Sequence, residues 1–164
     1  MRSPNSPQKD NYGRKKMIEL TPTEVALAAQ IGSRRYIEST FSKRQEKIGA
    51  SDGWNNNIEG CLAEVALAKH LNAWFDPHLM KFGEADVLDW HVRSTHHANG
   101  HLYIADYEET GKYILMIGKF NEWRIAGWCY AEDVRKPEFF RTVRDDRTVP
   151  NYWIPQKELQ KLED

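Results

Sequence analysis

The order of hydrophobic and polar residues divides this chain into a helical first half and a strand-rich second half. A helix is predicted from Thr21 to about Lys47, because apolar or small residues recur along it at helical spacing. The core-facing stripe of this helix consists of Val25, Ala29, Gly32 and Tyr36. Thr21 and Glu24 have the spacing of a capping box, and Pro22 occupies the first helical position, so the start of the helix is well marked.

A second helix is predicted over residues 58–71, after a loop over residues 49–57 that contains Gly, Ser and Asn. The helix is apolar on nearly all sides, which is typical of a helix that is buried on more than one face. Glu64 lies in its middle. An ionised carboxylate at such a position would be costly unless it were paired, bound to a metal or placed at a cleft.

The second half alternates between short apolar runs and turn residues. Strands are predicted at residues 86–88, 90–94, 101–105, 112–117 and 123–129. Asn99-Gly100 favours a hairpin turn, so these strands should form an antiparallel meander. Residues 131–140 begin like a helix that Pro137 interrupts, residues 151–154 form a candidate edge strand, and residues 155–162 form a candidate terminal helix. A meander after two helices indicates an α+β or mixed α/β fold.

Length and composition favour one globular domain. The chain has 164 residues, of which 40% are hydrophobic and 29% charged, and the domain is expected over residues 19–164. Residues 1–18 contain few apolar side chains and are expected to form a disordered arm. No segment approaches the roughly 20 apolar residues of a membrane span, so we expect a soluble, cytoplasmic protein without a membrane partner. Cys61 and Cys129 fit buried free thiols better than a zinc or redox motif.

Ionisable residues concentrate between Glu64 and Arg93. After Asp86, the side chains of Asp89, His91 and Arg93 share one face of a predicted strand, because side chains alternate along a strand. If the buried helix packs on that face, Glu64 joins them in one cleft. Carboxylates hold a hard divalent cation, and a cationic side chain beside them balances the charge of a phosphate. The pattern therefore suits a site for a metal ion and a phosphate.

In order and spacing, these residues resemble the PD-(D/E)XK phosphodiesterase superfamily, which has the restriction-endonuclease-like fold. The resemblance is closer to small phage-encoded members. It rests on Gly60-Cys-Leu-Ala-Glu64-Val-Ala66, Asp86-Val87, His91-Val92-Arg93-Ser94-Thr95 and Gly127-Trp128. It covers about residues 57–130 and implies a restriction-endonuclease-like core, in which helices flank a central mixed sheet.

The resemblance also implies catalytic roles. It assigns Asp86 and Glu64 to a divalent metal, His91 to the position of a second acidic ligand, and Arg93 to the position of a lysine that assists the attacking water. We expect Mg²⁺ or Mn²⁺ as the cofactor, and the imidazole of His91 suits Mn²⁺ better than Mg²⁺. Arg93 keeps its proton and cannot act as a general base, although it can clamp a phosphate.

Two functions stay open. The resemblance implies a metal-dependent nuclease that acts on DNA rather than RNA, in the host cytoplasm if a phage encodes it. The basic second half of the first helix would then follow the DNA backbone. Its candidate contacts are Arg34, Arg35, Lys43 and Arg44. The alternative is a nuclease fold that has lost catalysis and binds nucleic acid, or binds and inhibits a host protein. The net charge of −1 and the missing carboxylate at His91 favour this alternative.

Simpler structural roles compete with each assignment. Asp86 could cap a turn, and Glu64 could form a salt bridge with Arg93 across a packed interface. The basic helix face could be solvated. The histidines at 96, 97 and 101 fit exposed loop positions better than a metal site, and the acids at 106, 108 and 109 fit a solvated turn. The tryptophans at 123, 128 and 153 fit core packing better than base stacking.

Overall fold

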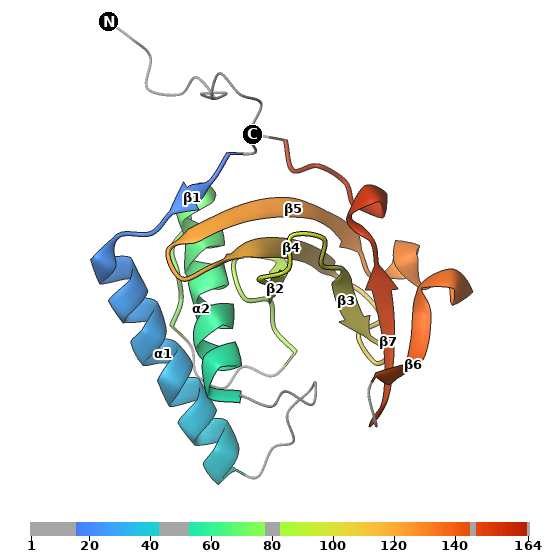
Figure 1. The fold of residues 1–164 in the computed structure, drawn as a ribbon, viewed down its shortest axis with the longest axis horizontal. Coiled ribbons are helices and arrows are strands. Elements are labelled where there is room, and N and C mark those ends of the chain that lie inside the picture. The colour runs from blue at the N-terminus through green and yellow to red at the C-terminus, as the bar shows by residue number, and fades with distance from the viewer. Residues whose placement is uncertain (1–15, 43–52, 78–82, 145–146, 164) are drawn as a thin grey trace, which may run out of the picture.

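The computed structural model describes residues 16–42, 53–77, 83–144 and 147–163 and arranges them in three layers (Figure 1). Helices α1 (Pro22–Phe41) and α2 (Gly53–His70) form the first layer. The strands are β1 (Ile18–Glu19), β2 (Trp90–Thr95), β3 (Leu102–Ala105), β4 (Lys112–Lys119), β5 (Glu122–Tyr130), β6 (Phe140–Arg144) and β7 (Arg147–Ile154). Short 3-10 helices span Glu132–Val134, Pro137–Phe139 and Gln156–Glu158. The expectation of a mixed fold of helices and strands is confirmed at this level.

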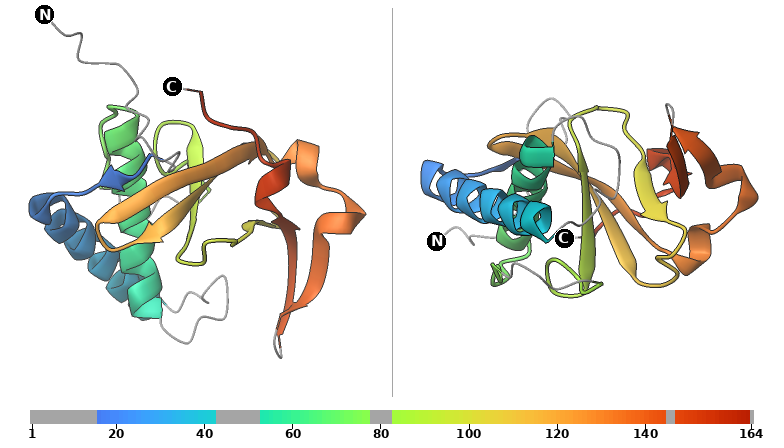
Figure 2. Two further views of the ribbon diagram at one scale, coloured as in Figure 1. Left: turned by 45° about the horizontal axis from the view of Figure 1, so that its top comes forward. Right: turned by 90° about the horizontal axis from the view of Figure 1, so that it is seen from below.

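The strands form two sheets, which make the second and third layers. Within the described residues, sheet A has the order β1-β5-β4-β2 and sheet B the order β3-β7-β6. Strand β2 runs parallel to β4, whereas the other neighbouring strands are antiparallel. Figure 2 shows the helices on one side of sheet A and sheet B on the other. Sheet A is therefore covered on both faces.

The antiparallel meander expected over residues 90–129 is wrong. Strands β4 and β5 pair as a hairpin, but β3 pairs with β7, so that Leu102 lies opposite Ile154. After β2 the chain crosses to sheet B, forms β3 and returns to sheet A as β4. Parallel neighbours such as β2 and β4 need a crossover of this kind, and β3 with its flanking turns supplies it. Residues 151–154, expected at an edge, lie in the central strand of sheet B.

Helix α1 begins with the predicted capping box. The Glu24 N–H donates to Thr21 Oγ1 at 3.3 Å, and the Thr21 N–H donates to Glu24 Oε2 at 2.7 Å. These bonds satisfy backbone donors that a helix start leaves without intrahelical partners. Lys69 of α2 also binds Glu24 Oε2, at 2.8 Å, and so links the start of α1 to the end of α2.

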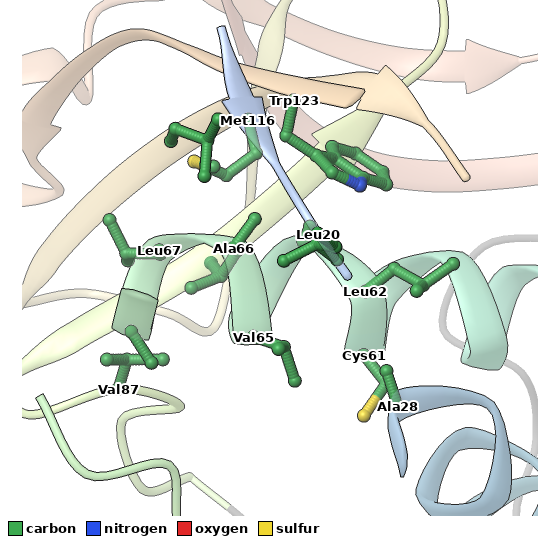
Figure 3. Packing of buried hydrophobic residues seen from close by; sticks show 14 of the residues in the cluster. Leu20, Ala28, Cys61, Leu62, Val65, Ala66, Leu67, Val87, Met116 and Trp123 are labelled. Carbon is green, nitrogen blue, oxygen red and sulfur yellow. The ribbon is translucent and has the colours of Figure 1, made fainter. Parts of the chain in front are cut away.

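Helix α2 is the most buried element of the first layer. Every residue from Cys61 to Ala68 is buried, including Glu64. Figure 3 shows Met116 and Trp123 of sheet A on one side of α2, and Ala28 of α1 beside Cys61 on another. Burying a side chain such as Leu62 or Leu67 stabilises a fold by about 1.5–3 kcal/mol. The prediction that this helix is buried on more than one side is confirmed.

A second core fills the space between sheet A and sheet B. Its fully buried members include Leu102, Ile104, Leu115 and Ile154, which come from both sheets. Cys129 belongs to this second core and Cys61 to the first, and both are buried free thiols, as expected. No helix among the described residues is long and apolar enough to cross a bilayer.

Several predicted boundaries change. Helix α2 begins at Gly53, so residues 53–57 are helical and not part of a loop. Helix α1 ends at Phe41, and its expected extension to Lys47 falls mostly outside the described residues. Most of the expected arm also lies outside them, but Ile18 is buried and pairs with Trp123, so the domain begins before residue 19. The expected terminal helix over residues 155–162 is reduced to one 3-10 turn at Gln156–Glu158.

Candidate functional site

Glu64 forms a buried ion pair with Arg35 of α1. Arg35 Nη1 lies 2.8 Å from both Glu64 Oε1 and Glu64 Oε2. The side chains are only 16% and 10% exposed, respectively. Arg35 was expected to contact nucleic acid, but its guanidinium points into the protein. The sequence offered a sign of this position, because Arg35 lies three residues after Gly32, about one helical turn further along the face that packs against α2.

The surroundings of the Glu64 carboxyl have opposing effects on its pKa. The pKa of Glu64 is raised from 4.5 to about 7, first by burial and then by the negative charge of Asp86, and this rise is net of the opposing effects of Arg35 and Arg93. Asp86 also acts on the pKa values of Arg35 and Arg93. Electrostatic interactions therefore link four residues: Glu64, Asp86, Arg35 and Arg93. We call these four residues the charge cluster.

Asp86 stabilises the turn that leads into β2. Its Oδ2 accepts the Val92 N–H at 2.7 Å, and its own N–H donates to the Trp90 carbonyl at 2.8 Å. Residues 86–88, predicted as a strand, form a turn with an isolated bridge between Val87 and Trp90. Leu88 within it has φ of 53°, a left-handed conformation that is strained for a non-glycine residue. The turn-capping role that competed with metal binding is thus present in the structure.

The two faces of β2 look in different directions. Trp90 and Val92 pack into the core that contains α2. Residues 91 and 93 alternate with them and face sheet B: His91 stacks on Tyr113, at 4.6 Å between ring centroids, and Arg93 lies over the same ring. The expectation that α2 would pack on the His91 and Arg93 face is wrong. Helix α2 takes the apolar face because large side chains there can be buried without loss of hydrogen bonds.

Arg93 is paired with Glu108. Its Nη2 lies 2.6 Å from Glu108 Oε1, and each side chain is 12% exposed. Glu108 Oε2 also accepts the Ala105 N–H at 2.9 Å. The Arg93 guanidinium lies over the rings of Tyr103 and Tyr113, at 5.2 and 5.1 Å from their centroids. Glu108 was expected in a solvated acidic turn. It was missed because the sequence around it carries no sign of the β3–β4 crossover that buries it.

The other predicted residues lie apart from the charge cluster. Asp89 forms a surface ion pair with Lys112 at 2.7 Å. His96, His97 and His101 are exposed, as expected. Trp123 is buried in the first core, as expected, and Arg34 is exposed. Lys43 and Arg44 lie outside the described residues.

The predicted metal ligands do not meet as a set. Among the described residues, no group of three or more His, Cys, Asp and Glu side chains is placed to hold a metal ion. Glu64 and Asp86 interact, but His91 faces sheet B and Arg35 contacts both oxygens of Glu64. The Arg35 guanidinium therefore occupies the position beside Glu64 that a divalent cation would need.

Comparisons with known proteins identify no relative. No protein-family model, no curated protein and no solved structure matches this chain.

Proposed function

We propose that this chain binds nucleic acid without cleaving it, on a scaffold that resembles PD-(D/E)XK nucleases. One observation carries the proposal: Arg35 Nη1 contacts both carboxylate oxygens of Glu64 at 2.8 Å in a mostly buried pair. A Mg²⁺ or Mn²⁺ ion would have to displace this guanidinium. The displaced cation would then be left without its anion in a place of low solvent access, which is costly.

Arg93 is no better placed for catalysis. A residue that stabilises a phosphorane-like charge must reach the scissile phosphate, but the Arg93 side chain is 12% exposed and its charge is balanced by Glu108 at 2.6 Å. Separating Arg93 from Glu108 would leave two buried charges without an opposite charge. These contacts support a structural role for Arg93 rather than a role in phosphate binding.

The outer face of α1 offers a surface for a nucleic-acid strand. Arg34 and Phe41 are seven residues apart and therefore lie on one face of the helix, about two turns apart. Arg34 is exposed, and Phe41 is 85% exposed. A cation and an aromatic ring in this arrangement can contact a phosphate and a stacked base of a single strand. We refer to Arg34 and Phe41 as the α1 pair.

The experiment is a mobility shift and a cleavage assay with the same single- and double-stranded DNA, in Mg²⁺ and in Mn²⁺. We expect a salt-sensitive shift of the single strand and no cleavage product. Arg34→Ala and Phe41→Ala should each weaken the shift by about 5- to 30-fold, by loss of a phosphate contact or a stacked base. Arg141→Ala and Phe120→Ala remove an exposed cation and an exposed ring from other elements and should leave the shift unchanged.

Two outcomes would overturn the proposal. The first is metal-dependent cleavage that disappears in Asp86→Asn and Glu64→Ala but persists in Asp133→Asn, a control at an exposed acid. That result would establish the phosphodiesterase. The second is no shift at any salt concentration, which would favour a protein partner.

A protein partner is the second candidate, because the outer face of α1 also carries exposed apolar side chains. Leu27 is 46% exposed and Ile37 is 45% exposed. Both lie on the same side of the helix as Phe41. In this case Leu27→Ser and Ile37→Ser would abolish capture of the partner, whereas they should have little effect on a DNA shift.

A further inference from the structure

A pocket remote from the charge cluster opens where the two ends of the described chain meet. It has a volume of about 340 Å³, which lies within the range of small-molecule sites. Four segments line it: the residues before and within β1, the last turn of α2, the middle of β5 and the C-terminal segment. Figure 1 shows β1, β5 and the C-terminal segment approaching one another on this side of the molecule.

The walls of the pocket are fixed by main-chain contacts. Trp128 of β5 and Gln160 exchange two backbone hydrogen bonds, at 2.9 and 2.8 Å. Gly127 has φ of +149°, and a Cβ there would lie 2.6 Å from Leu159 Cβ, so the C-terminal segment rests directly on the backbone of β5. Further along the same edge of β5, opposite the edge that β4 occupies, the pairing of Ile18 with Trp123 holds β1 in place. The pocket is therefore a preformed feature.

The lining combines positive charge with an apolar wall. Lys16, His70 and Lys161 line it together with Ile18, Ile125 and Leu162, and none of the described residues that line it is acidic. Two ammonium groups match the charge of a dianion better than that of a single carboxylate. The aliphatic side chains can cover the uncharged part of such a ligand.

We propose that this pocket binds a phosphate monoester, with the phosphate between Lys16 and Lys161 and the organic group against Ile18, Ile125 and Leu162. A phosphate monoester is present in a free mononucleotide and at a phosphorylated end of a nucleic-acid strand. The pocket would bind it whether or not the α1 pair contacts nucleic acid, since the two sites share no residue.

Calorimetric titration of the full chain tests the pocket. The probes are adenosine 5′-monophosphate, adenosine, inorganic phosphate, and one oligonucleotide with either a 5′-phosphate or a 5′-hydroxyl. The monophosphate should bind at least about tenfold more tightly than adenosine, which lacks the charge-assisted hydrogen bonds. It should also bind more tightly than inorganic phosphate, which lacks the organic group. Tighter binding of the 5′-phosphorylated oligonucleotide than of the 5′-hydroxyl form would identify a strand end as the source. No gain from the 5′-phosphate on the oligonucleotide, with tight binding of the monophosphate, would identify a free nucleotide.

Substitutions of lysines test whether the monophosphate binds in the pocket. Lys161→Met and Lys16→Met should each weaken the monophosphate by about tenfold. Lys119→Met, an exposed lysine at the end of β4 that does not line the pocket, should leave the affinity unchanged. All three variants should keep the circular dichroism spectrum of the wild type. Equal affinity for adenosine and its monophosphate, wild-type affinity in both pocket variants, or no binding of any probe would overturn the proposal.

Discussion

The two faces of sheet A each bury one arginine–glutamate pair, and the pairs differ in how well their charges are compensated. On the sheet B face, Glu108 binds Arg93 and also the Ala105 N–H, and two tyrosine rings enclose the guanidinium. On the helix face, Glu64 binds Arg35 but senses a second acid, Asp86. In the first pair the two charges balance, although Arg93 Nε is buried without a hydrogen-bond partner among the described residues. In the second pair, the negative charge of Asp86 acts unfavourably on that of Glu64.

The helix-side cluster carries an electrostatic cost. Two acids close together repel one another, which raises the free energy needed to bury both. Asp86 has a structural role of its own, since its Oδ2 accepts the Val92 N–H. The guanidinium of Arg35 offsets the repulsion from within the protein.

The largest effect should come from breaking the pair on the sheet B face. Glu108→Ala leaves Arg93 charged and buried, since the Arg93 side chain is 12% exposed. Loss of one partner of a buried pair costs about 3–5 kcal/mol, and urea unfolding at neutral pH should show a loss of that size. The neighbouring Glu109→Ala, at an exposed position, should change stability by less than about 0.5 kcal/mol. Equal effects of the two substitutions would show that Arg93 and Glu108 are not a buried pair in solution.

The pair on the helix face should make the free energy of unfolding depend on pH. The pKa of Glu64 is raised from 4.5 to about 7, so the folded state holds this proton more tightly than the unfolded state. The resulting stability is fully present below the unfolded value of 4.5 and is lost as the pH rises through about 7. The contribution is on the order of 3 kcal/mol. Burial is the largest cause of the raised pKa of Glu64, and Asp86, Arg35 and Arg93 are the neighbouring charges that act on it.

Urea unfolding at several pH values measures this contribution. The free energy of unfolding of the wild type should fall, relative to Glu64→Gln, as the pH rises across this range. Glu138→Gln, which removes an exposed carboxyl, should follow the wild type at every pH. A constant difference between wild type and Glu64→Gln would mean that Glu64 is ionised throughout and fully paired with Arg35.

The helix layer also depends on close packing of α1 against α2. A Cβ on Gly32 would lie 2.7 Å from both the carbonyl oxygen of Asn57 and the Cα of Ile58, and the backbone of α2 cannot move aside easily. Gly32→Ala should therefore destabilise the protein by about 1–3 kcal/mol. Gly60 offers a matched control, because a Cβ there meets nothing within 4 Å. Gly60→Ala should stabilise α2 by up to about 1 kcal/mol, and thermal unfolding can compare the two. Stabilisation by both changes would contradict the close contact.

The smallest effect should come from the start of α1. Thr21→Ala removes the side chain that accepts the Glu24 N–H and should cost about 1 kcal/mol in chemical unfolding. Thr23→Ala, two residues on and exposed, should cost a few tenths at most. A larger loss at Thr23 than at Thr21 would place the helix start elsewhere.

Much of the local structure could be predicted from the sequence. Thr21, Pro22 and Glu24 form the helix start that their spacing predicts, and the apolar run around Glu64 is a buried helix. Strands β4 and β5 lie within two residues of their expected bounds. These features depend on residues that are neighbours in the sequence, so short-range patterns are enough to specify them.

The candidate site was predictable only in part. Glu64, Asp86 and Arg93 do influence one another, as their order along the chain suggested. The face of β2 that α2 covers was predicted incorrectly, and Glu108 was assigned to a solvated turn. Both errors have one cause. Alternation along a strand separates two faces but does not say which partner covers each face, and in sheet A both faces are covered.

By itself, the sequence determined where the helices and most strands form, which residues share a face of each, and that acids would be placed within apolar elements. Tertiary structure alone decided that β2 lies parallel to β4, that β3 joins β7, and that Arg35 and Glu108 are the partners of Glu64 and Arg93. These choices join segments far apart in the chain. They are set by the burial of both faces of sheet A and by the need of each buried charge for an opposite one.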